Sequence, residues 1–582
     1  MFRSLERKRP SVDALLECFT MRSSSTCFES WLLCLALLCV LTTCTSRSVE
    51  TFNSIVQRSS AKWLPCPVFT PGFWNSSIVP ADAKAECANL SLPLRWKTAL
   101  EHRPFSFASK EPPANISIFV KRVYNATTAA RIEGHLYLLE GGPGGSGINL
   151  EPTVLTLMEK KWLGKELDFI LVDHRGTGRS ELLTCPNASS LNGPTGNFSA
   201  CVEYLNESIG LDALKEFSTT NAAMDVLATI HIVNTTTKSA LPNYIYGLSY
   251  GTYWAARLIQ VAGDWAPPSA LTSVVLDSFA VPGVPFTTYD DGVSTSVANL
   301  FDTCAQLSPS CKAKLTDFPI NVVAETYKHF GDAPSLPCLT LTNVSKIELQ
   351  QLGWLFGQQT DMRLLLPPLF LRLFRCNAED QQQLSFFFRV LANLTSVSKP
   401  QVLLSSVLQW NIILSEMLTQ GLVPLPSATQ AFYHSDALYF ASYIPALAAK
   451  VSPLWPKYSL DPYVGRLPNA SLPILLLSGE LDPETNQGDS LWAASRFLQA
   501  SSQGFVSIPY GPHGVLLTQA SNSEVPCGVQ IMSSFLEAGE HGFAQVNTTC
   551  VRYLLPPDFE GKLNTTQLLS MQYFGTASFW TG

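Results

Sequence analysis

From Ile116 onward, short runs of apolar, β-prone residues alternate with longer stretches of helical pattern. A strand followed by a helix and another strand is the repeating unit of a largely parallel sheet, so this alternation predicts an α/β fold. Most of the predicted strands end at a loop of unusual chemistry, and open α/β sheets bind ligands beyond the carboxyl ends of their strands. The predicted strands cover residues 135–139, 168–172, 244–246, 273–276, 474–477 and 505–508.

The alternation fades between about Val281 and Pro456, where Leu and Phe recur at helical spacing. The predicted helices there include residues 349–356, 364–374 and 384–397, and the strand pattern returns at Leu472. Apolar stripes of this kind usually pack helix against helix, which favours that interpretation over a substrate groove. We therefore predict a helical cap, residues 281–456, inserted between two parts of one α/β core, residues 47–280 and 457–582.

The first 46 residues have the layout of a secretory signal peptide. A basic stretch that reaches Arg22 precedes an apolar run from Trp31 to Leu41, followed by small residues. The basic part is long, and a start at Met21 would give one of ordinary length. An uncleaved anchor is the alternative, but the run is shorter than the ~20 apolar residues that span a bilayer. We expect a soluble mature protein that is secreted or lies in a vacuolar or lysosomal lumen.

Composition narrows the class of protein further. The chain of 582 residues exceeds the length at which one hydrophobic core usually stops growing, about 250–300 residues, so an insertion or a second domain is expected. Its residues are 46% hydrophobic and 15% charged, which predicts a globular protein. The net charge of −7 leaves no broad basic surface for a phosphate backbone, and this argues against a nucleic acid partner.

Cysteine usage agrees with export. Removal of the leader takes away five cysteines and leaves ten, an even number that suits a set of disulfides in an oxidising compartment. No CxxC pair argues for zinc, and no other metal is implied. Proximity along the chain suggests a pairing, although sequence alone leaves the connectivity open. The suggested pairs are Cys66–Cys87, Cys185–Cys201, Cys304–Cys311, Cys338–Cys376 and Cys527–Cys550.

Asn-x-Ser/Thr acceptors recur throughout the chain behind the leader. Thirteen of them predict a surface with N-linked glycans if the host secretes through an endoplasmic reticulum. They are Asn75, Asn89, Asn115, Asn125, Asn187, Asn197, Asn206, Asn234, Asn343, Asn393, Asn469, Asn547 and Asn564.

The strongest chemical signal is a Gly-x-Ser-x-Gly motif from Gly247 to Gly251, between a predicted strand and the helical residues 253–259. A sharp strand-to-helix turn lifts the hydroxyl of Ser249 above the sheet, and the glycines remove side chains that would clash. Chance matches to the motif are common, and a serine in an ordinary glycine turn is the alternative. The flanking strand and helix favour a nucleophile.

A serine hydroxyl needs a base, and eight histidines are available. His513 follows the last predicted strand and comes after Ser249 in the chain order of α/β-hydrolases. His135 and His231 lie within a strand-like and a helix-like run, where a packed structural role is expected.

The third member of a triad is a carboxylate that orients the imidazole. Asp482 follows a predicted strand and lies between Ser249 and His513 in the chain, which completes the order Ser, Asp, His. The rivals are Glu480, two residues earlier, and Asp277, at the end of the strand before the cap.

An oxyanion hole requires N–H donors placed where negative charge develops. One predicted donor is the backbone N–H of Tyr250, next to the nucleophile. The other is expected in the glycine loop of residues 141–147 (GGPGGSG), at Gly142. A nucleotide-binding loop is disfavoured, because the Lys-Ser/Thr ending and a clean GxGxxG helix entry are both missing. No organic cofactor is implied.

Together these motifs resemble the proline iminopeptidase and tripeptidyl aminopeptidase family of α/β-hydrolases. The likeness covers roughly residues 63–550 and is weak across the cap. Cys66 and residues 86–94 resemble the secreted tripeptidyl branch, as does the Cys527–Cys550 segment, which looks like its C-terminal extension. The matching motifs are GGPGGSG (141–147), DHRGTGRS (173–180), GLSYGT (247–252), GELDP (479–483) and GPHG (511–514).

The resemblance implies a serine exopeptidase that removes short peptides or proline from a free N-terminus, under a closing cap. It also implies acidic cap residues that bind the substrate ammonium, since a desolvated cation needs a paired carboxylate. The sequence does not choose among Glu325, Asp332, Glu348, Asp361, Glu379, Asp380 and Glu416.

One departure from the family pattern, two bracing residues and two rival functions complete the prediction. Glu140 precedes the glycines where relatives usually carry Asn-Pro or His-Gly, which leaves the second oxyanion donor open. Asp173 and Arg175 are expected to brace nearby loops.

A secreted carboxylesterase or lipase with the same triad is the first rival function, because specificity lies in the cap. A non-catalytic binding protein with the hydrolase fold is the second.

Overall fold

The computed structural model describes residues 48–57, 61–101, 115–160, 162–193, 196–237, 241–315, 318–330, 337–395, 400, 402–422 and 424–581. The predicted signal peptide and residues 396–397 of one predicted helix lie outside these ranges. Within them, no helix has the length and apolar character needed to cross a bilayer.

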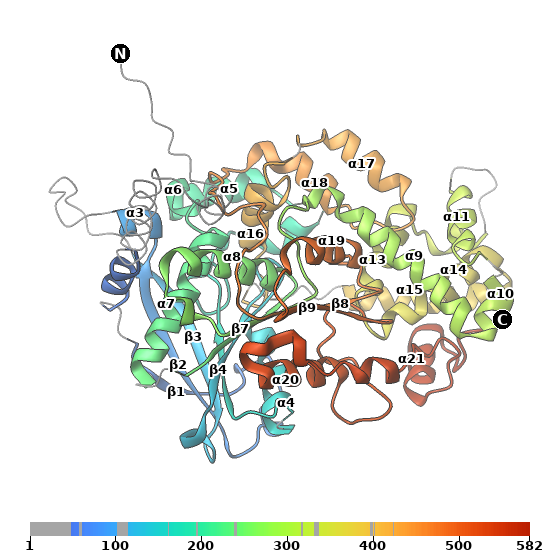
Figure 1. Ribbon diagram of the computed structural model, residues 1–582. Helices are drawn as coiled ribbons and strands as arrows, with labels where there is room; N and C mark the ends of the chain where they lie inside the picture. Colours follow the sequence, from blue (N-terminus) through green and yellow to red (C-terminus); the bar gives the residue numbers. More distant parts are fainter. Residues whose placement is uncertain are drawn as a thin grey trace, which may run out of the picture.

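One nine-stranded sheet occupies the centre of the molecule, in the order β1-β2-β3-β5-β4-β6-β7-β8-β9 (Figure 1). The six strands from β5 to β9 in this order are parallel, and β1, β2 and β3 continue the sheet in antiparallel pairing. The strands are β1 (Leu64–Cys66), β2 (Ala83–Pro93), β3 (Asn115–Asn125), β4 (Gly134–Leu139), β5 (Leu167–Val172), β6 (Asn243–Leu248), β7 (Ser273–Asp277), β8 (Ile474–Gly479) and β9 (Gln503–Ile508). All six predicted strands are confirmed, together with the largely parallel sheet.

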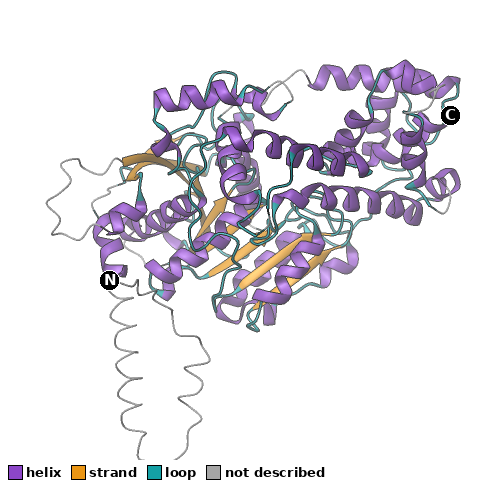
Figure 2. Cartoon of the chain, turned by 90° about the horizontal axis from the view of Figure 1, so that it is seen from above, coloured by secondary structure: helices purple, strands orange, loops and turns teal. Residues whose placement is uncertain are grey.

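Side chains of the parallel strands alternate between two apolar layers, as the two-residue period of a strand requires. In β4, Tyr137 and Leu139 pack in the layer of α7 (Thr219–Thr237) and α8 (Tyr250–Trp265). Leu136 and Leu138 pack in the opposite layer, with α4 (Glu151–Lys160) and α20 (Cys527–Ala538). Helices therefore cover both faces of the sheet, as the view from above also shows (Figure 2).

The chain between β7 and β8 forms helices and no strand in its described residues, and most of them gather beside the β8–β9 side of the sheet (Figure 1). Residues 349–356 lie in α13, residues 364–374 in a 3-10 turn and α14, and residues 384–395 in α15, so these predicted helices are present. The cap boundaries at residues 281 and 456 stay a prediction. The helices are α9 (Tyr289–Leu307), α10 (Pro309–Leu315), α11 (Asn321–Lys328), α12 (Pro337–Thr342), α13 (Lys346–Gly357), α14 (Leu366–Arg375), α15 (Ala378–Thr395), α16 (Ser406–Ile412), α17 (Ala428–Ala437) and α18 (Ile444–Val451).

The C-terminal residues pack against this helical insertion. Phe574, at the end of α21 (Asn564–Phe574), stacks on Phe387 of α15 with ring centroids 5.3 Å apart. Arg372 of α14 donates to the carbonyl oxygen of Phe579 at 2.7 Å, and the Phe579 ring is fully buried. The second core segment, which supplies β8 and β9, thus ends by supporting the insertion rather than the sheet.

Five disulfides join the cysteines in the pairing that proximity along the chain suggests: Cys66–Cys87, Cys185–Cys201, Cys304–Cys311, Cys338–Cys376 and Cys527–Cys550. Among the acceptor asparagines whose exposure the structure describes, Asn125 and Asn234 are half-buried and the others are exposed, and Asn393 lies outside this set. Glycans at the exposed positions would not disturb the core.

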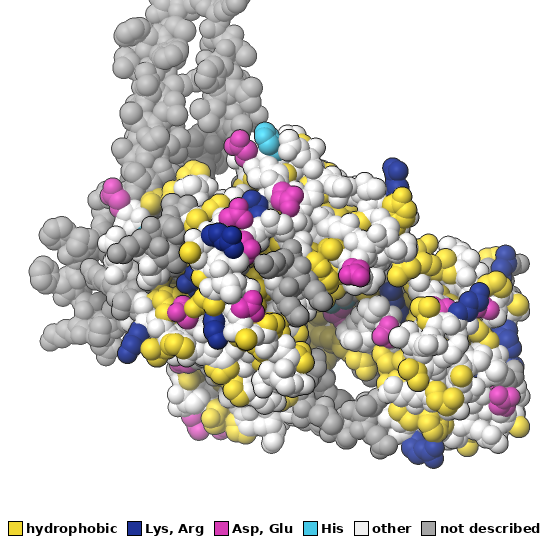
Figure 3. Space-filling model, turned by 90° about the horizontal axis from the view of Figure 1, so that it is seen from below, with side chains coloured by type: hydrophobic (Ala, Val, Ile, Leu, Met, Phe, Trp, Pro, Cys, Tyr) yellow, Lys and Arg dark blue, Asp and Glu magenta, His cyan; other side chains and the backbone are white. Residues whose placement is uncertain are grey.

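The face seen from below mixes apolar, acidic and basic side chains (Figure 3). Where undescribed residues do not cover it, lysines and arginines are scattered among carboxylates instead of forming one continuous basic area. This distribution accords with the net charge of −7.

Candidate active site

Ser249 occupies a sharp turn between β6 and α8. Its backbone has φ 57° and ψ −128°, a strained conformation for a residue with a side chain. The turn also requires its glycines, because a Cβ on Gly251 would lie 2.0 Å from the carbonyl oxygen of Leu139. A Cβ on Gly247 would lie 2.5 Å from the carbonyl oxygen of Gly251. Backbone strain at a half-buried serine between a strand and a helix is the geometry of a nucleophile elbow.

Asp482 and His513 contact each other directly. Both carboxylate oxygens of Asp482 lie 3.0 Å from Nδ1 of His513. The Asp482 carboxylate is fully buried and also accepts hydrogen bonds from Thr485 Oγ1 at 2.7 Å and from the backbone N–H of Glu484 at 2.8 Å. The His513 side chain remains 19% exposed, so its ring can reach both the carboxylate and the space above the sheet.

The two rival carboxylates have other partners. Glu480 is exposed and accepts a hydrogen bond from Ser507 Oγ at 2.8 Å. Asp277 is fully buried and accepts from the backbone N–H groups of Val515 and Leu516 and from the hydroxyl of Tyr246. The structure therefore brings His513 together with Asp482, and uses Asp277 to hold the chain just after His513.

Asp277 also links this loop to the elbow, because its carbonyl oxygen accepts from the backbone N–H of Ser249 at 3.0 Å. Ser278, the next residue, accepts from the backbone N–H of Gly514 at 2.8 Å. Within the described ranges Ser249 and His513 share no direct hydrogen bond. Such contacts are often long in unliganded enzymes and tighten when the substrate binds.

The glycine loop lies beside the elbow, where Gly142 and Pro143 line the same pocket as Ser249 and Tyr250. Segments far away in the sequence hold the loop in place. The carbonyl oxygen of Gly144 accepts from the backbone N–H of Ser405 at 2.9 Å and from Thr177 Oγ1 at 2.8 Å. The contact with Ser405 ties the predicted oxyanion loop to the helical insertion, and the contact with Thr177 ties it to the loop after β5.

Asp173 and Arg175 contact loops near the site, as their predicted bracing role requires. Asp173 accepts from the backbone N–H of Gly147 at 2.9 Å and from Arg179 Nε at 2.8 Å. Arg175 pairs with Asp225 and donates to the carbonyl oxygen of Leu94 at 2.8 Å.

The charged groups of the site shift one another's pKa. Burial disfavours the imidazolium of His513, but the Asp482 carboxylate outweighs it, with help from Glu484 and Asp277, and raises the pKa of His513 to about 9. Burial opposes ionisation of Asp482 as well, yet His513 and hydrogen bonds from Thr485 hold the pKa of this carboxyl below its usual value. Each group thus favours the charged form of the other.

One pocket contains Ser249. Its walls are largely apolar, with Phe279, Val281, Val284, Phe286 and Met417 among them. Its carboxylates are Glu484 and Asp489, which both follow β8.

None of the six described cap carboxylates proposed for the substrate ammonium lines this pocket, and Asp332 lies outside the described residues. Glu416 and Asp380 are buried in ion pairs with Arg257 and Arg375, and Glu325 pairs with Lys328 at the surface. Glu348 caps α13, and Glu379 and Asp361 are exposed.

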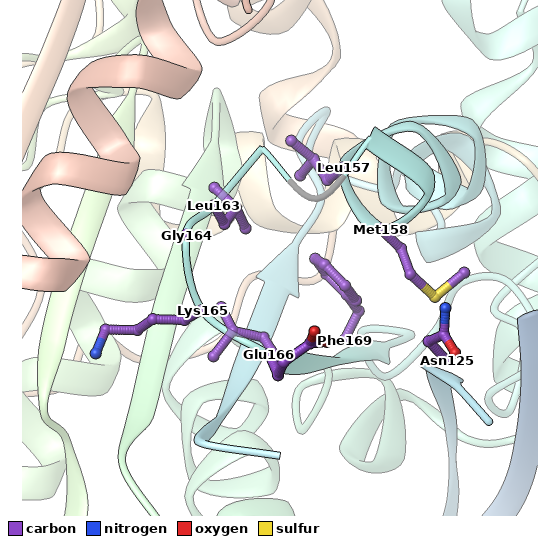
Figure 4. Close-up of a pocket in the computed structure, with 9 residues that line it drawn as sticks. Asn125, Leu157, Met158, Leu163, Gly164, Lys165, Glu166 and Phe169 are labelled. Atoms are coloured by element: carbon purple, nitrogen blue, oxygen red, sulfur yellow. The ribbon is translucent and has the colours of Figure 1, made fainter. Parts of the chain in front are cut away.

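A second pocket lies near the amino end of β5, away from the carboxyl ends of the parallel strands (Figure 4). Leu157, Met158 and Phe169 line it, together with Lys165 and Glu166 of the loop that enters β5 at its amino end. It lacks a nucleophile with an adjacent base, and Asn125 is its remaining polar side chain. Because the elbow lies at the carboxyl ends of the strands, this pocket is separate from the candidate active site.

Sequence reasoning missed two contributors to the site. Glu484 lies within the stretch after β8 that supplied Asp482, but its position in the pocket depends on side chains of the insertion. Asp277 was expected only as a structural carboxylate, and its specific role as the anchor of the chain after His513 was not predicted, although an aspartate at the carboxyl end of a parallel strand is a recognisable signal.

The sheet, the strained serine between β6 and α8, and the chain order Ser, Asp, His define an α/β-hydrolase fold. The chain also resembles curated tripeptidyl aminopeptidases. Those from Streptomyces coelicolor and Streptomyces lividans are each 29% identical to it over 182 residues, which are 28% of this chain and 32% of the relative. The chain therefore matches about a third of the length of these relatives. No family model matches the sequence.

Solved structures of hydrolases align with large parts of the chain. An esterase from Exiguobacterium antarcticum is 14% identical, with a TM-score of 0.27, and the alignment covers 69% of this chain and 91% of the esterase. A peroxisomal alpha-beta-hydrolase from Saccharomyces cerevisiae is 13% identical, with a TM-score of 0.30. The alignment covers 75% of this chain and 84% of that hydrolase. These scores are too low to support an argument about function, so the fold assignment rests on the topology and the elbow.

Proposed function

We propose that the protein is a serine hydrolase in which Ser249 is the nucleophile, His513 the general base and Asp482 the group that orients His513. The observation that carries the proposal is the direct contact between Asp482 and His513, on a loop anchored beside the strained Ser249 elbow. The proposal requires His513 Nε2 to come within hydrogen-bond reach of Ser249 Oγ when the substrate binds. The Gly-x-Ser-x-Gly motif alone is weaker support, because matches to it are common by chance.

The mechanism follows from these positions. His513 Nε2 accepts the hydroxyl proton as Ser249 Oγ attacks the substrate carbonyl, and Asp482 stabilises the resulting imidazolium. The backbone N–H groups of Tyr250 and Gly142 stabilise the oxyanion. His513 then donates its proton to the leaving group, the C–N or C–O bond breaks, and water hydrolyses the acyl-enzyme by the same steps.

We propose peptides with a free N-terminus as substrates, from which the enzyme releases short peptides or proline. Two findings support this choice. The curated relatives are named tripeptidyl aminopeptidases. The pocket combines an apolar wall with two carboxylates, which suits an apolar residue next to an ammonium group.

The apolar wall also favours a second candidate, a carboxylesterase, since Phe279, Val284 and Met417 would contact an uncharged acyl chain equally well. One substrate set separates the two. Peptide arylamides with a free N-terminus, the same arylamides with an acetylated N-terminus, and p-nitrophenyl acyl esters are compared on one preparation. Preference for the free N-terminus supports the aminopeptidase, and turnover of esters alone supports the esterase.

Labelling by a fluorophosphonate tests the triad itself. The wild type should be labelled, Ser249→Ala should not, and Asp482→Asn should lose activity by roughly 10⁴-fold because it favours the wrong histidine tautomer. A wild-type protein that is folded yet inert to the probe would favour a non-catalytic binding protein instead.

We also propose that the protein enters the secretory pathway and carries N-linked glycans. The basic and apolar leader, the disulfides and the exposed acceptor asparagines support this proposal. Expression in a secreting eukaryotic host, followed by N-terminal sequencing and endoglycosidase treatment, tests it. Retention of the leader in the recovered protein would contradict the cleavage.

A further inference from the structure

Glu484 places a carboxylate beside the triad without belonging to it. It lies in the loop between β8 and α19 (Gln487–Phe497), and its backbone N–H donates to Asp482 Oδ1 at 2.8 Å. Its side chain lines the pocket that contains Ser249. The loop that positions the triad carboxylate therefore also positions Glu484 relative to the nucleophile.

Two side chains of the helical insertion orient the Glu484 carboxylate. The hydroxyl of Tyr289, at the start of α9, donates to Oε2 at 2.6 Å. The indole N–H of Trp354, on α13, lies 2.9 Å from Oε1 and 3.0 Å from the Tyr289 hydroxyl. Each oxygen thus accepts one hydrogen bond, and an ionised carboxylate has further lone pairs for a ligand.

The Glu484 carboxylate has no fixed cationic partner. In the described part of the chain it forms no ion pair, whereas the buried Glu416 pairs with Arg257 at 3.0 Å and Asp380 pairs with Arg375 at 2.6 Å. A carboxylate withdrawn from water without a cation is costly, and a cationic ligand that enters the pocket removes part of that cost. His513 is the positive group that acts on the pKa of Glu484, and as the proposed proton carrier it cannot remain charged throughout the reaction.

We infer that Glu484 binds the α-ammonium group of the substrate, and so sets how far from the N-terminus Ser249 attacks. This role belongs to the core loop after β8 and not to the cap carboxylates that the sequence suggested. It rests on the proposed aminopeptidase function, because an ester substrate offers no ammonium group. Tyr289 and Trp354 then act as positioning residues that couple the insertion to substrate recognition.

The test is Glu484→Gln, which removes the charge and keeps the shape. The matched control is Glu480→Gln, the same change four residues earlier on an exposed side chain outside the pocket. For arylamides with a free N-terminus, Glu484→Gln should lower kcat/KM about 30-fold or more, mainly through KM, because it removes one partner of a desolvated charge pair. Hydrolysis of the acetylated arylamide and of the ester should not decrease, because removal of the Glu484 charge lowers the pKa of His513 and leaves more of this base neutral.

A second variant, Tyr289→Phe, keeps the charge and removes one orienting hydrogen bond, so it should raise KM for free N-termini by a smaller factor. Fluorophosphonate labelling reports whether each variant is folded with a working triad. Equal losses on free and blocked substrates in a labelled Glu484→Gln variant would overturn the inference, as would an unchanged preference for free N-termini. A wild-type enzyme without that preference would overturn the proposed aminopeptidase function itself, which is a different result.

Discussion

At the scale of single residues, the carboxylates around His513 differ in role because they differ in hydrogen-bond donors. Asp482 accepts from His513 and from its own loop, so its charge acts on the imidazole. Asp277 accepts from the two N–H groups that follow Gly514, so its charge holds the loop. Glu484 accepts from the insertion and faces the pocket. All three carboxylates lie between Ser249 and His513 in the chain, so chain order alone did not separate their roles.

The raised pKa of His513 predicts an activity that increases with pH. His513, the proposed general base, must be neutral to accept a proton, and Asp482 outweighs burial to raise the pKa of His513 from 6.5 to about 9. We therefore expect kcat/KM for an uncharged ester to rise with pH and to level off above about pH 9. A pH–rate profile that is already flat from pH 7 would contradict the shift.

The raised pKa of His513 also affects folding stability, which should decrease with rising pH while activity increases. A histidine whose pKa is raised in the folded state stabilises the fold fully below its ordinary value of 6.5, and this contribution disappears as pH rises through about 9. The active and the most stable protonation states of His513 are therefore different states.

Asp277→Asn tests the anchoring role of Asp277. An amide can turn only one oxygen toward the N–H groups of Val515 and Leu516, and its NH₂ group would face a donor. We expect the free energy of unfolding to fall by about 1–3 kcal/mol and kcat to fall with it, as the His513 loop shifts. Urea denaturation and ester kinetics measure the two effects. Asp291→Asn, on a half-exposed side chain, is the control and should change stability by less than about 1 kcal/mol.

At the scale of elements, helix α8 must approach β4 closely to hold the elbow. Gly251→Ala would place a Cβ 2.0 Å from the carbonyl oxygen of Leu139, whereas a Cβ on Gly263 of the same helix meets nothing within 4 Å. We expect Gly251→Ala to abolish fluorophosphonate labelling, and Gly263→Ala to stabilise the protein by about 0.5–1 kcal/mol through lower backbone entropy in the unfolded chain. Thermal unfolding followed by labelling compares them. Normal labelling of Gly251→Ala would show that the approach is not required.

Local patterns predicted the parallel strands because each is a short apolar run buried on both faces and followed by a helix. The same approach missed β1, β2 and β3, and with them the antiparallel pairing. In β2, buried positions such as Leu90 alternate with exposed ones such as Asn89, and a strand with one exposed face gives a weaker apolar signal. The cap carboxylates were not distinguishable from sequence, because whether Glu416 meets Arg257 or a substrate depends on tertiary contacts.

At the scale of the whole molecule, the insertion is held from three directions. Ser405 binds the glycine loop, and Tyr289 and Trp354 bind Glu484 beside the triad. The C-terminal segment adds a support from outside through Phe579 and Arg372. An insertion attached at these points couples the walls of the pocket to residues distant in sequence.

Phe579→Ala tests that coupling. Loss of a fully buried aromatic ring from the apolar cluster that the C-terminal segment shares with the insertion should lower the free energy of unfolding by about 3–5 kcal/mol. Leu568→Ala on α21, at a side chain that is 69% exposed, should change it by less than about 0.5 kcal/mol. Because the insertion orients Glu484, Phe579→Ala should also raise KM for free N-terminal substrates while fluorophosphonate labelling of Ser249 persists. Loss of stability with unchanged KM would mean that the C-terminal segment supports the fold without influencing the pocket.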